Sequence, residues 1–167
     1  MLFLIRLSQF LLLLALQVLV LNQIQLFGYA TPMLCVALLL YFPQNTSRVE
    51  LLLWSFAMGL CVDVFSNTPG VCSGSMTFAA MLRPVLLELQ LPKDDAEDLV
   101  PTFRSMGMWS HLRFVISLLF VHLAAYHLLD AFSFFHLADV AISFASSFAL
   151  SIVLLLLIDS FRGRANA

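Results

Sequence analysis

Apolar residues fill six stretches of the chain, and polar residues, glycines and prolines separate them. The stretches lie at about 2–22, 29–42, 49–66, 71–91, 109–130 and 139–160. A helix needs roughly 20 predominantly apolar residues to cross a bilayer, and most of the stretches approach that length. The pattern predicts an all-α integral membrane protein with six transmembrane helices. We expect a single membrane domain over 1–167, with one long cytoplasmic loop at about 92–108.

The second stretch is the shortest, and Pro32 and Pro43 stand near its two ends. A stretch of 10–14 apolar residues is often re-entrant rather than spanning. The distribution of charge favours spanning: with six spans, all 8 Lys and Arg residues lie on one side of the membrane. Because basic residues concentrate in cytoplasmic loops, we expect both termini in the cytoplasm. A re-entrant second segment would move Arg83, Lys93 and Arg104 outside.

Composition narrows the class of protein. Hydrophobic residues make up 62% of the chain, charged residues 11%, and the mean hydropathy is +0.99. A soluble domain is roughly 45–50% apolar and 25% charged, so lipid must cover much of this surface. The balance of 8 Lys and Arg against 10 Asp and Glu lacks the basic stripe of a nucleic-acid binder. The apolar run after Arg6 ends without an A-x-A cleavage site, and we interpret it as a retained first helix.

Asp63 is the most informative polar position in a predicted span. Ser55, Gly59 and Asp63 are four residues apart, so they form one small, polar stripe that another helix can approach closely. Every Lys and Arg is predicted on the opposite side of the membrane. We therefore expect the carboxylate to accept hydrogen bonds from backbone N–H groups and hydroxyls at the start of the next helix. Two roles stay open: fixing the hairpin between the third and fourth helices, or binding a partner or a proton.

The fourth stretch carries two further features. Gly70 and Gly74 have the G-x-x-x-G spacing that permits close helix packing. Arg83-Pro84 lies near its predicted cytoplasmic end. Proline removes an intrahelical hydrogen bond, and arginine can extend to lipid headgroups, so we interpret the pair as a kink with an interfacial anchor.

The cysteines and histidines that could carry catalysis or bind a metal do not have the spacing of known metal sites or catalytic motifs. Cys35, Cys61 and Cys72 have no C-x-x-C pairing, and we interpret them as packing residues. His111 and His122 are about 16 Å apart along one helix, too far to share an ion. Neither Cys72 in its G-x-C-x-G context nor His127 near Ser73 and Ser75 forms a recognisable hydrolase motif. We expect no catalytic residue, no metal and no cofactor.

The chain resembles the rod shape-determining protein MreD family of bacteria. The most specific block runs from Gly59 to Gly70 and reads G-L-x-x-D-x-F-S-x-T-x-G; Leu16–Asn22, 26–29 and Arg83-Pro84 extend the likeness. The structural or partner-binding candidates are Ser55, Gly59, Asp63, Asn67, Thr68, Pro69, Gly70, Gly74, Arg83 and Pro84.

The resemblance implies a non-catalytic subunit of the cell-elongation complex in the bacterial inner membrane. Its partners would be MreC, MreB, and the elongation-specific glycosyltransferase and penicillin-binding transpeptidase of lateral peptidoglycan synthesis. The family is also similar in fold to the substrate-binding subunits of energy-coupling-factor transporters. A vitamin-binding transport subunit is therefore an alternative, with Asp63, Asn67, Asp130, His127 and His136 as candidate pocket residues. An intramembrane hydrolase is a further alternative.

Overall fold

The computed structural model describes residues 2–21, 32–90, 100–101, 106–130 and 137–165, and within these ranges every regular element is a helix. In chain order the elements are α1 (Leu2–Ala15), the π-helix η1 (Leu16–Leu21), α2 (Ala37–Tyr41), α3 (Arg48–Ser66), α4 (Val71–Glu88), α6 (Met108–Asp130) and α7 (Leu137–Ala165). The predicted all-α class is confirmed for the described part of the chain.

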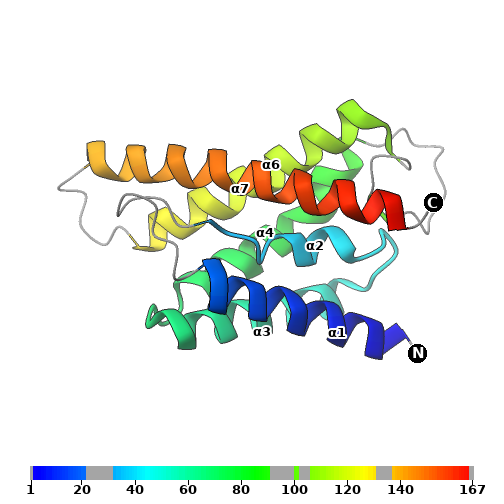
Figure 1. The fold of residues 1–167 in the computed structure, drawn as a ribbon, viewed down its shortest axis with the longest axis horizontal. Helices are drawn as coiled ribbons and strands as arrows, with labels where there is room; N and C mark the ends of the chain where they lie inside the picture. The colour runs from blue at the N-terminus through cyan, green and yellow to red at the C-terminus, as the bar shows by residue number, and fades with distance from the viewer. Residues whose placement is uncertain (1, 22–31, 91–99, 102–105, 131–136, 166–167) are drawn as a thin grey trace.

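The helices form one elongated bundle (Figure 1). η1 continues α1, and from α1 onward each further helix runs against the direction of the one before it. The start of α1 and the end of α7 lie at the same end of the bundle. α3 packs on α4, α4 on α6, and α6 on α7. The short α2 lies at the centre of the bundle. α4 therefore contacts both α3 and α6.

Within the described residues, four helical segments are long and apolar enough to cross a membrane, namely Leu4–Leu21, Arg48–Ser66, Met108–Asp130 and Ala141–Asp159. Their outward faces carry exposed large apolar side chains, including Leu19, Leu53, Phe120 and Val153. Such surface is stable only against lipid or another apolar partner. The predictions of a membrane protein and of transmembrane helices are thus supported by the structure.

The predicted boundaries agree closely with the observed ones for the third and fifth stretches. The first stretch is helical as predicted, but its last turns form a π-helix, which the apolar pattern does not indicate. The fourth helix ends at Glu88, earlier than predicted, and α7 is longer than predicted at both ends. Most of the predicted loop at 92–108 lies outside the described residues.

The second stretch departs most from prediction, because only Ala37–Tyr41 is α-helical. Pro32 to Leu34 are non-helical, and residues 29–31 lie outside the described part. The continuous helix predicted over 29–42 is therefore wrong. The stretch nevertheless runs against the direction of α1, toward the start of α3 (Figure 1). Residues 32–40 are all buried, so other elements enclose this irregular backbone.

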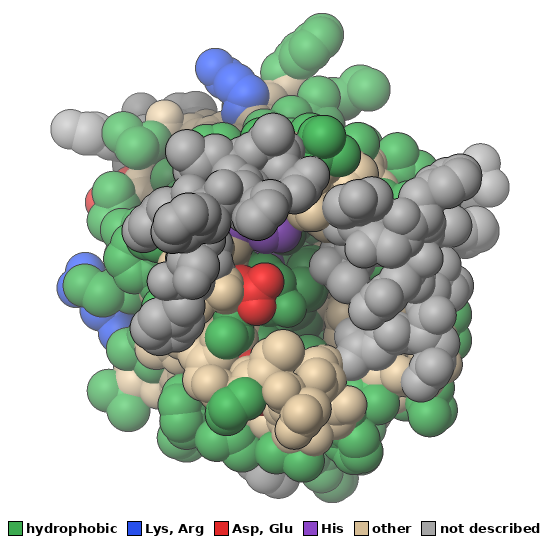
Figure 2. All heavy atoms as spheres, turned by 90° about the vertical axis from the view of Figure 1, so that its left-hand side faces the viewer, with side chains coloured by type: hydrophobic (Ala, Val, Ile, Leu, Met, Phe, Trp, Pro, Cys, Tyr) green, Lys and Arg blue, Asp and Glu red, His purple; other side chains and the backbone are tan. Residues whose placement is uncertain are grey.

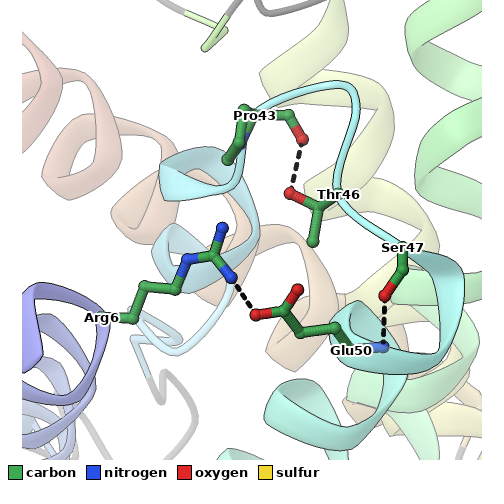
Figure 3. Close-up of polar contacts among 5 residues, drawn as sticks. All are labelled: Arg6, Pro43, Thr46, Ser47 and Glu50. Atoms are coloured by element: carbon green, nitrogen blue, oxygen red, sulfur yellow. Dashed lines mark hydrogen bonds and ion pairs between the residues drawn. The ribbon is translucent and has the colours of Figure 1, made fainter. Parts of the chain in front are cut away.

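The end of the bundle where α3 begins is closed by polar contacts (Figure 3). The hydroxyl of Ser47 accepts the backbone N–H of Glu50 at 3.3 Å and caps α3. The Glu50 carboxylate pairs with Arg6 of α1. The Arg6 guanidinium also lies 5.1 Å from the centre of the Phe42 ring. These contacts tie α1 to α3 and to the end of the second stretch.

Candidate functional site

The connection between α3 and α4 is a tight turn held by two residues with positive φ. Asn67 ends α3 at φ 56°, and its backbone N–H bonds to the carbonyl oxygen of Asp63. Gly70 precedes α4 at φ 88°, where a residue with a β-carbon would be strained. The turn therefore needs a residue that tolerates positive φ at each of these two positions, and the G-L-x-x-D-x-F-S-x-T-x-G block specifies Gly70 but leaves position 67 open.

The Asp63 side chain joins the two helices of this hairpin. Its Oδ1 accepts the backbone N–H of Cys72 at 2.8 Å, and its Oδ2 accepts that of Ser73 at 2.8 Å. The Thr68 hydroxyl donates to Oδ1 at 3.2 Å. The first N–H groups of a helix have no partner within the helix and carry partial positive charge, so a carboxylate is well suited to them. The expectation that Asp63 accepts hydrogen bonds from the start of the next helix is confirmed.

Gly59 allows the close approach that this bonding needs. A β-carbon at Gly59 would lie 2.7 Å from the carbonyl oxygen of Cys72 and 2.7 Å from the nitrogen of Ser73. Ser55, one turn earlier, is fully buried, and its hydroxyl donates to the carbonyl of Leu51 at 2.7 Å. Ser55, Gly59 and Asp63 are all buried, as predicted for a stripe that faces another helix.

Gly74 does not share this contact. A β-carbon there would lie 3.0 Å from Cδ1 of Leu129, so Gly74 faces α6 rather than α3. Gly74 also lines an apolar groove of about 630 Å³ between α4 and α6. Pro69 and Gly70 are exposed at the tip of the turn. The G-x-x-x-G spacing thus combines a turn residue with a packing residue and does not form one interface.

Side chains satisfy the buried irregular backbone of the second stretch. The Gln17 amide donates to the carbonyl of Pro32 at 3.1 Å and accepts the N–H of Leu34 at 2.7 Å. The Ser151 hydroxyl accepts the N–H of Met33 at 2.9 Å. Irregular backbone at membrane depth is tolerated where protein groups replace water as partners. Gln17 and Ser151 supply such groups from η1 and α7, and the apolar pattern of the chain does not reveal them.

Arg83 has a different role from the one that the sequence suggested. It is 2% exposed, its Nε donates to the carbonyl of Leu39 at 2.8 Å, and its terminal NH2 donates to the carbonyl of Phe42. The interpretation as an anchor to lipid headgroups is wrong, because these carbonyls at the end of α2 hold the side chain inside the bundle. Pro84 lies within α4, as predicted.

The sequence pattern also gave no indication of a buried pair formed by a histidine and an acid. His111 Nε2 of α6 lies 2.5 Å from Asp159 Oδ2 of α7, and both side chains are buried. The two residues are 48 positions apart in the sequence, so their spacing gives no local signal. Within the described residues no group of three or more His, Cys, Asp or Glu side chains is arranged to hold a metal ion.

The two ends of the bundle differ in charge. Arg6, Arg48, Arg83 and Arg113 lie in the parts of their helices nearer the end where α1 begins. Figure 2 shows the opposite end, where an acidic side chain and a histidine lie in a hollow and basic side chains are visible only at the margins. Lys93 and Arg104 lie outside the described residues. The described cations therefore follow the predicted asymmetry.

Among the described residues, several candidates for the two alternative functions make contacts of other kinds. Ser75 donates to the carbonyl of Cys72 at 3.0 Å, and Nε2 of His122 faces the Cys35 sulfur at 3.8 Å. Of the transport candidates, Asp63 is occupied by backbone N–H groups, Asn67 caps α3, and His136 lies outside the described residues.

Comparisons with protein-family models, curated proteins and solved structures give no match to this chain.

Proposed function

We propose that the chain is a non-catalytic subunit of the bacterial cell-elongation complex, of the MreD type. In this proposal it spans the inner membrane six times with both termini in the cytoplasm, and it shares its fold with the substrate-binding subunits of energy-coupling-factor transporters. Its partners are MreC and, through the complex, MreB and the enzymes that build lateral peptidoglycan.

The observation that carries the proposal is the physical role of Gly59, Asp63 and Gly70, which belong to the block on which the resemblance rests, and of Asn67 within it. Gly59 admits α4, and Asp63 accepts two N–H groups of its first turn. Asn67 and Gly70 supply the positive φ angles of the turn. The polar groups of these residues are engaged within the hairpin itself. That arrangement suits a scaffold that presents a fixed surface better than it suits an enzyme.

The hairpin also offers an apolar surface beside its polar tip. Val64 and Phe65 are 71% and 64% exposed, and the turn residue Pro69 is exposed next to them. A membrane partner with one transmembrane helix and an external domain, as MreC would be, can contact both kinds of surface. Asp63 is buried and is not part of this surface, but its hydrogen bonds hold together the two helices that carry it.

Complementation tests the proposal. The gene for this chain should restore rod shape to a host whose own MreD has been deleted, provided that the host's MreC is compatible or supplied with it. Membrane abundance of the chain is measured in parallel. Abundant chain together with its cognate MreC, but with round cells, would contradict the proposed function.

A further inference from the structure

The apolar groove between α4 and α6 takes no part in the polar contacts of the hairpin. It holds about 630 Å³, and the described residues that line it come from these two helices. Three of them, Gly74, Ala124 and Ala125, are small and half-buried. The groove exists because these residues have too few side-chain atoms to fill the space between the two helices.

The larger residues beside the groove project outward. Phe78, Phe120 and Leu128 are all exposed on the surface of the bundle. None of the described lining residues has a charged or polar side chain. Such a surface is stable against hydrocarbon, and it offers no partner to a polar or charged group. The occupant that matches it is therefore a hydrocarbon chain.

The groove covers about half of the depth of a membrane. Along α6 its lining runs from Phe120 to Leu129, which corresponds to about 13.5 Å of helix. α6 ends at Asp130, so the groove starts at that end of the bundle and extends inward. The hydrocarbon region of a bilayer is about 30 Å thick, so one leaflet supplies about 15 Å. The length of the groove thus matches a single leaflet.

Two phenylalanine rings lie at the deep end of the groove. Phe78 is the deepest lining residue of α4, and Phe120 is the deepest of α6. The Phe120 ring packs edge-on against the rings of Phe144 and Phe148 of α7, with 5.6 and 6.3 Å between ring centres. These contacts fix Phe120 in position. A helix that crosses the membrane would have to continue past both rings into the other leaflet, where the lining has ended.

We propose that the groove binds one acyl chain of a phospholipid, from the leaflet at the end of the bundle where α6 ends. The acyl chain lies along α6 beside Ala124 and Ala125, and its methyl end points toward Phe78 and Phe120. Because the lining has no charge, the headgroup stays in the interfacial region and only the chain is bound. The inference depends on the membrane location of the protein and is independent of the partners proposed above.

Photocrosslinking of the full chain in vesicles tests the proposal. The vesicles contain phosphatidylethanolamine, phosphatidylglycerol and a trace of phosphatidylcholine with a diazirine midway along one acyl chain. After irradiation, peptide mapping should find more cross-links at Ala124 and Leu128 than at Leu60 of α3. Leu60 is the matched reference, because it is exposed outside the groove and lies as far from the end of its helix at Ser66 as Ala124 lies from Asp130. Equal labelling of the groove and of Leu60 would overturn the proposal.

Two variants sharpen the result. Ala124→Phe fills the groove and should reduce cross-links at Leu128 to the level at Leu60. Ala149→Phe is the matched control, because Ala149 is exposed on α7 outside the lining, and it should leave labelling of the groove unchanged. Undiminished labelling in Ala124→Phe would overturn the proposal. So would a wild-type groove that the lipid probe labels less than Leu60, since a protein segment would then cover it; the wild-type map decides this even if the filled variant does not fold.

Discussion

A β-carbon on Gly59 would lie 2.7 Å from the backbone nitrogen of Ser73, which is closer than atoms of two packed helices can come. The same nitrogen donates to Oδ2 of Asp63. The packing of α3 on α4 and the hydrogen bonds of Asp63 therefore depend on each other. A side chain at position 59 would have to push apart the groups that Asp63 joins.

Gly59→Ala should destabilise the protein by about 1–3 kcal/mol or more, because the obstructing atoms are backbone and cannot rotate away. Gly74→Ala is the matched control, since its β-carbon would meet only the end of the Leu129 side chain at 3.0 Å. Thermal unfolding in detergent measures both variants. Equal midpoints for the two would contradict the close approach at Gly59.

Substitutions at Asp63 should follow a fixed order of stability. Asp63→Asn retains one acceptor oxygen but turns an amide N–H₂ toward the second donor, so it should be intermediate. Asp63→Leu leaves the N–H groups of Cys72 and Ser73 unmatched, at about 1–3 kcal/mol each. Asp63→Lys should be the worst, because it sets a cation against the positive end of α4.

Membrane abundance and unfolding midpoints should rank these variants in that order, with MreC binding falling in parallel. The informative exception is Asp63→Asn protein that is abundant and binds MreC normally but fails to restore cell shape. That result would reject a structural role and indicate chemistry at the carboxylate.

Gln17→Leu should destabilise the protein by about 1–3 kcal/mol for each unmatched group, because the carbonyl of Pro32 and the N–H of Leu34 would both lose a partner in a buried place. Gln9→Leu on the same helix serves as the control, since Gln9 is only half-buried. Urea or heat unfolding followed by tryptophan fluorescence compares the two. A larger loss at Gln9 would show that the irregular segment does not depend on Gln17.

The part of the site that was predictable from the sequence is the part that lies within one hairpin. Asp63 and the first turn of α4 are only about ten residues apart, and the predicted absence of nearby cations left backbone N–H groups as partners. Helix lengths were predictable for the same reason, because apolar runs are local.

The contacts that could not be predicted join residues distant in the sequence. Gln17 and Ser151 form hydrogen bonds with the irregular backbone near Pro32. The continuous helix predicted over 29–42 gave no reason to expect that side chains would bind this backbone. Arg83 looked like an interfacial residue because its position near the end of α4 is compatible with lipid. Only the tertiary structure shows that the carbonyls at the end of α2 face it.

The proposed topology, with six spans and both termini in the cytoplasm, predicts on which side of the membrane each connection lies. Reporter fusions within 42–47, within 93–98 and after Ala167 should report the cytoplasm, and insertions within 23–25 and 132–135 should report the outside. The physical reason is the excess of Lys and Arg on one side. An external signal from 93–98 would overturn the six-span topology and favour a re-entrant second segment.

The most direct test of the proposed function is the identity of the proteins that the chain binds in its own membrane. A tagged chain is purified in mild detergent from the native host, and the bound proteins and small molecules are identified by mass spectrometry, with an unrelated tagged membrane protein as control. If the proposed function is right, MreC is recovered in near-stoichiometric amount, with elongation enzymes beside it. Recovery of transporter ATPases and a bound vitamin, without MreC, would contradict it.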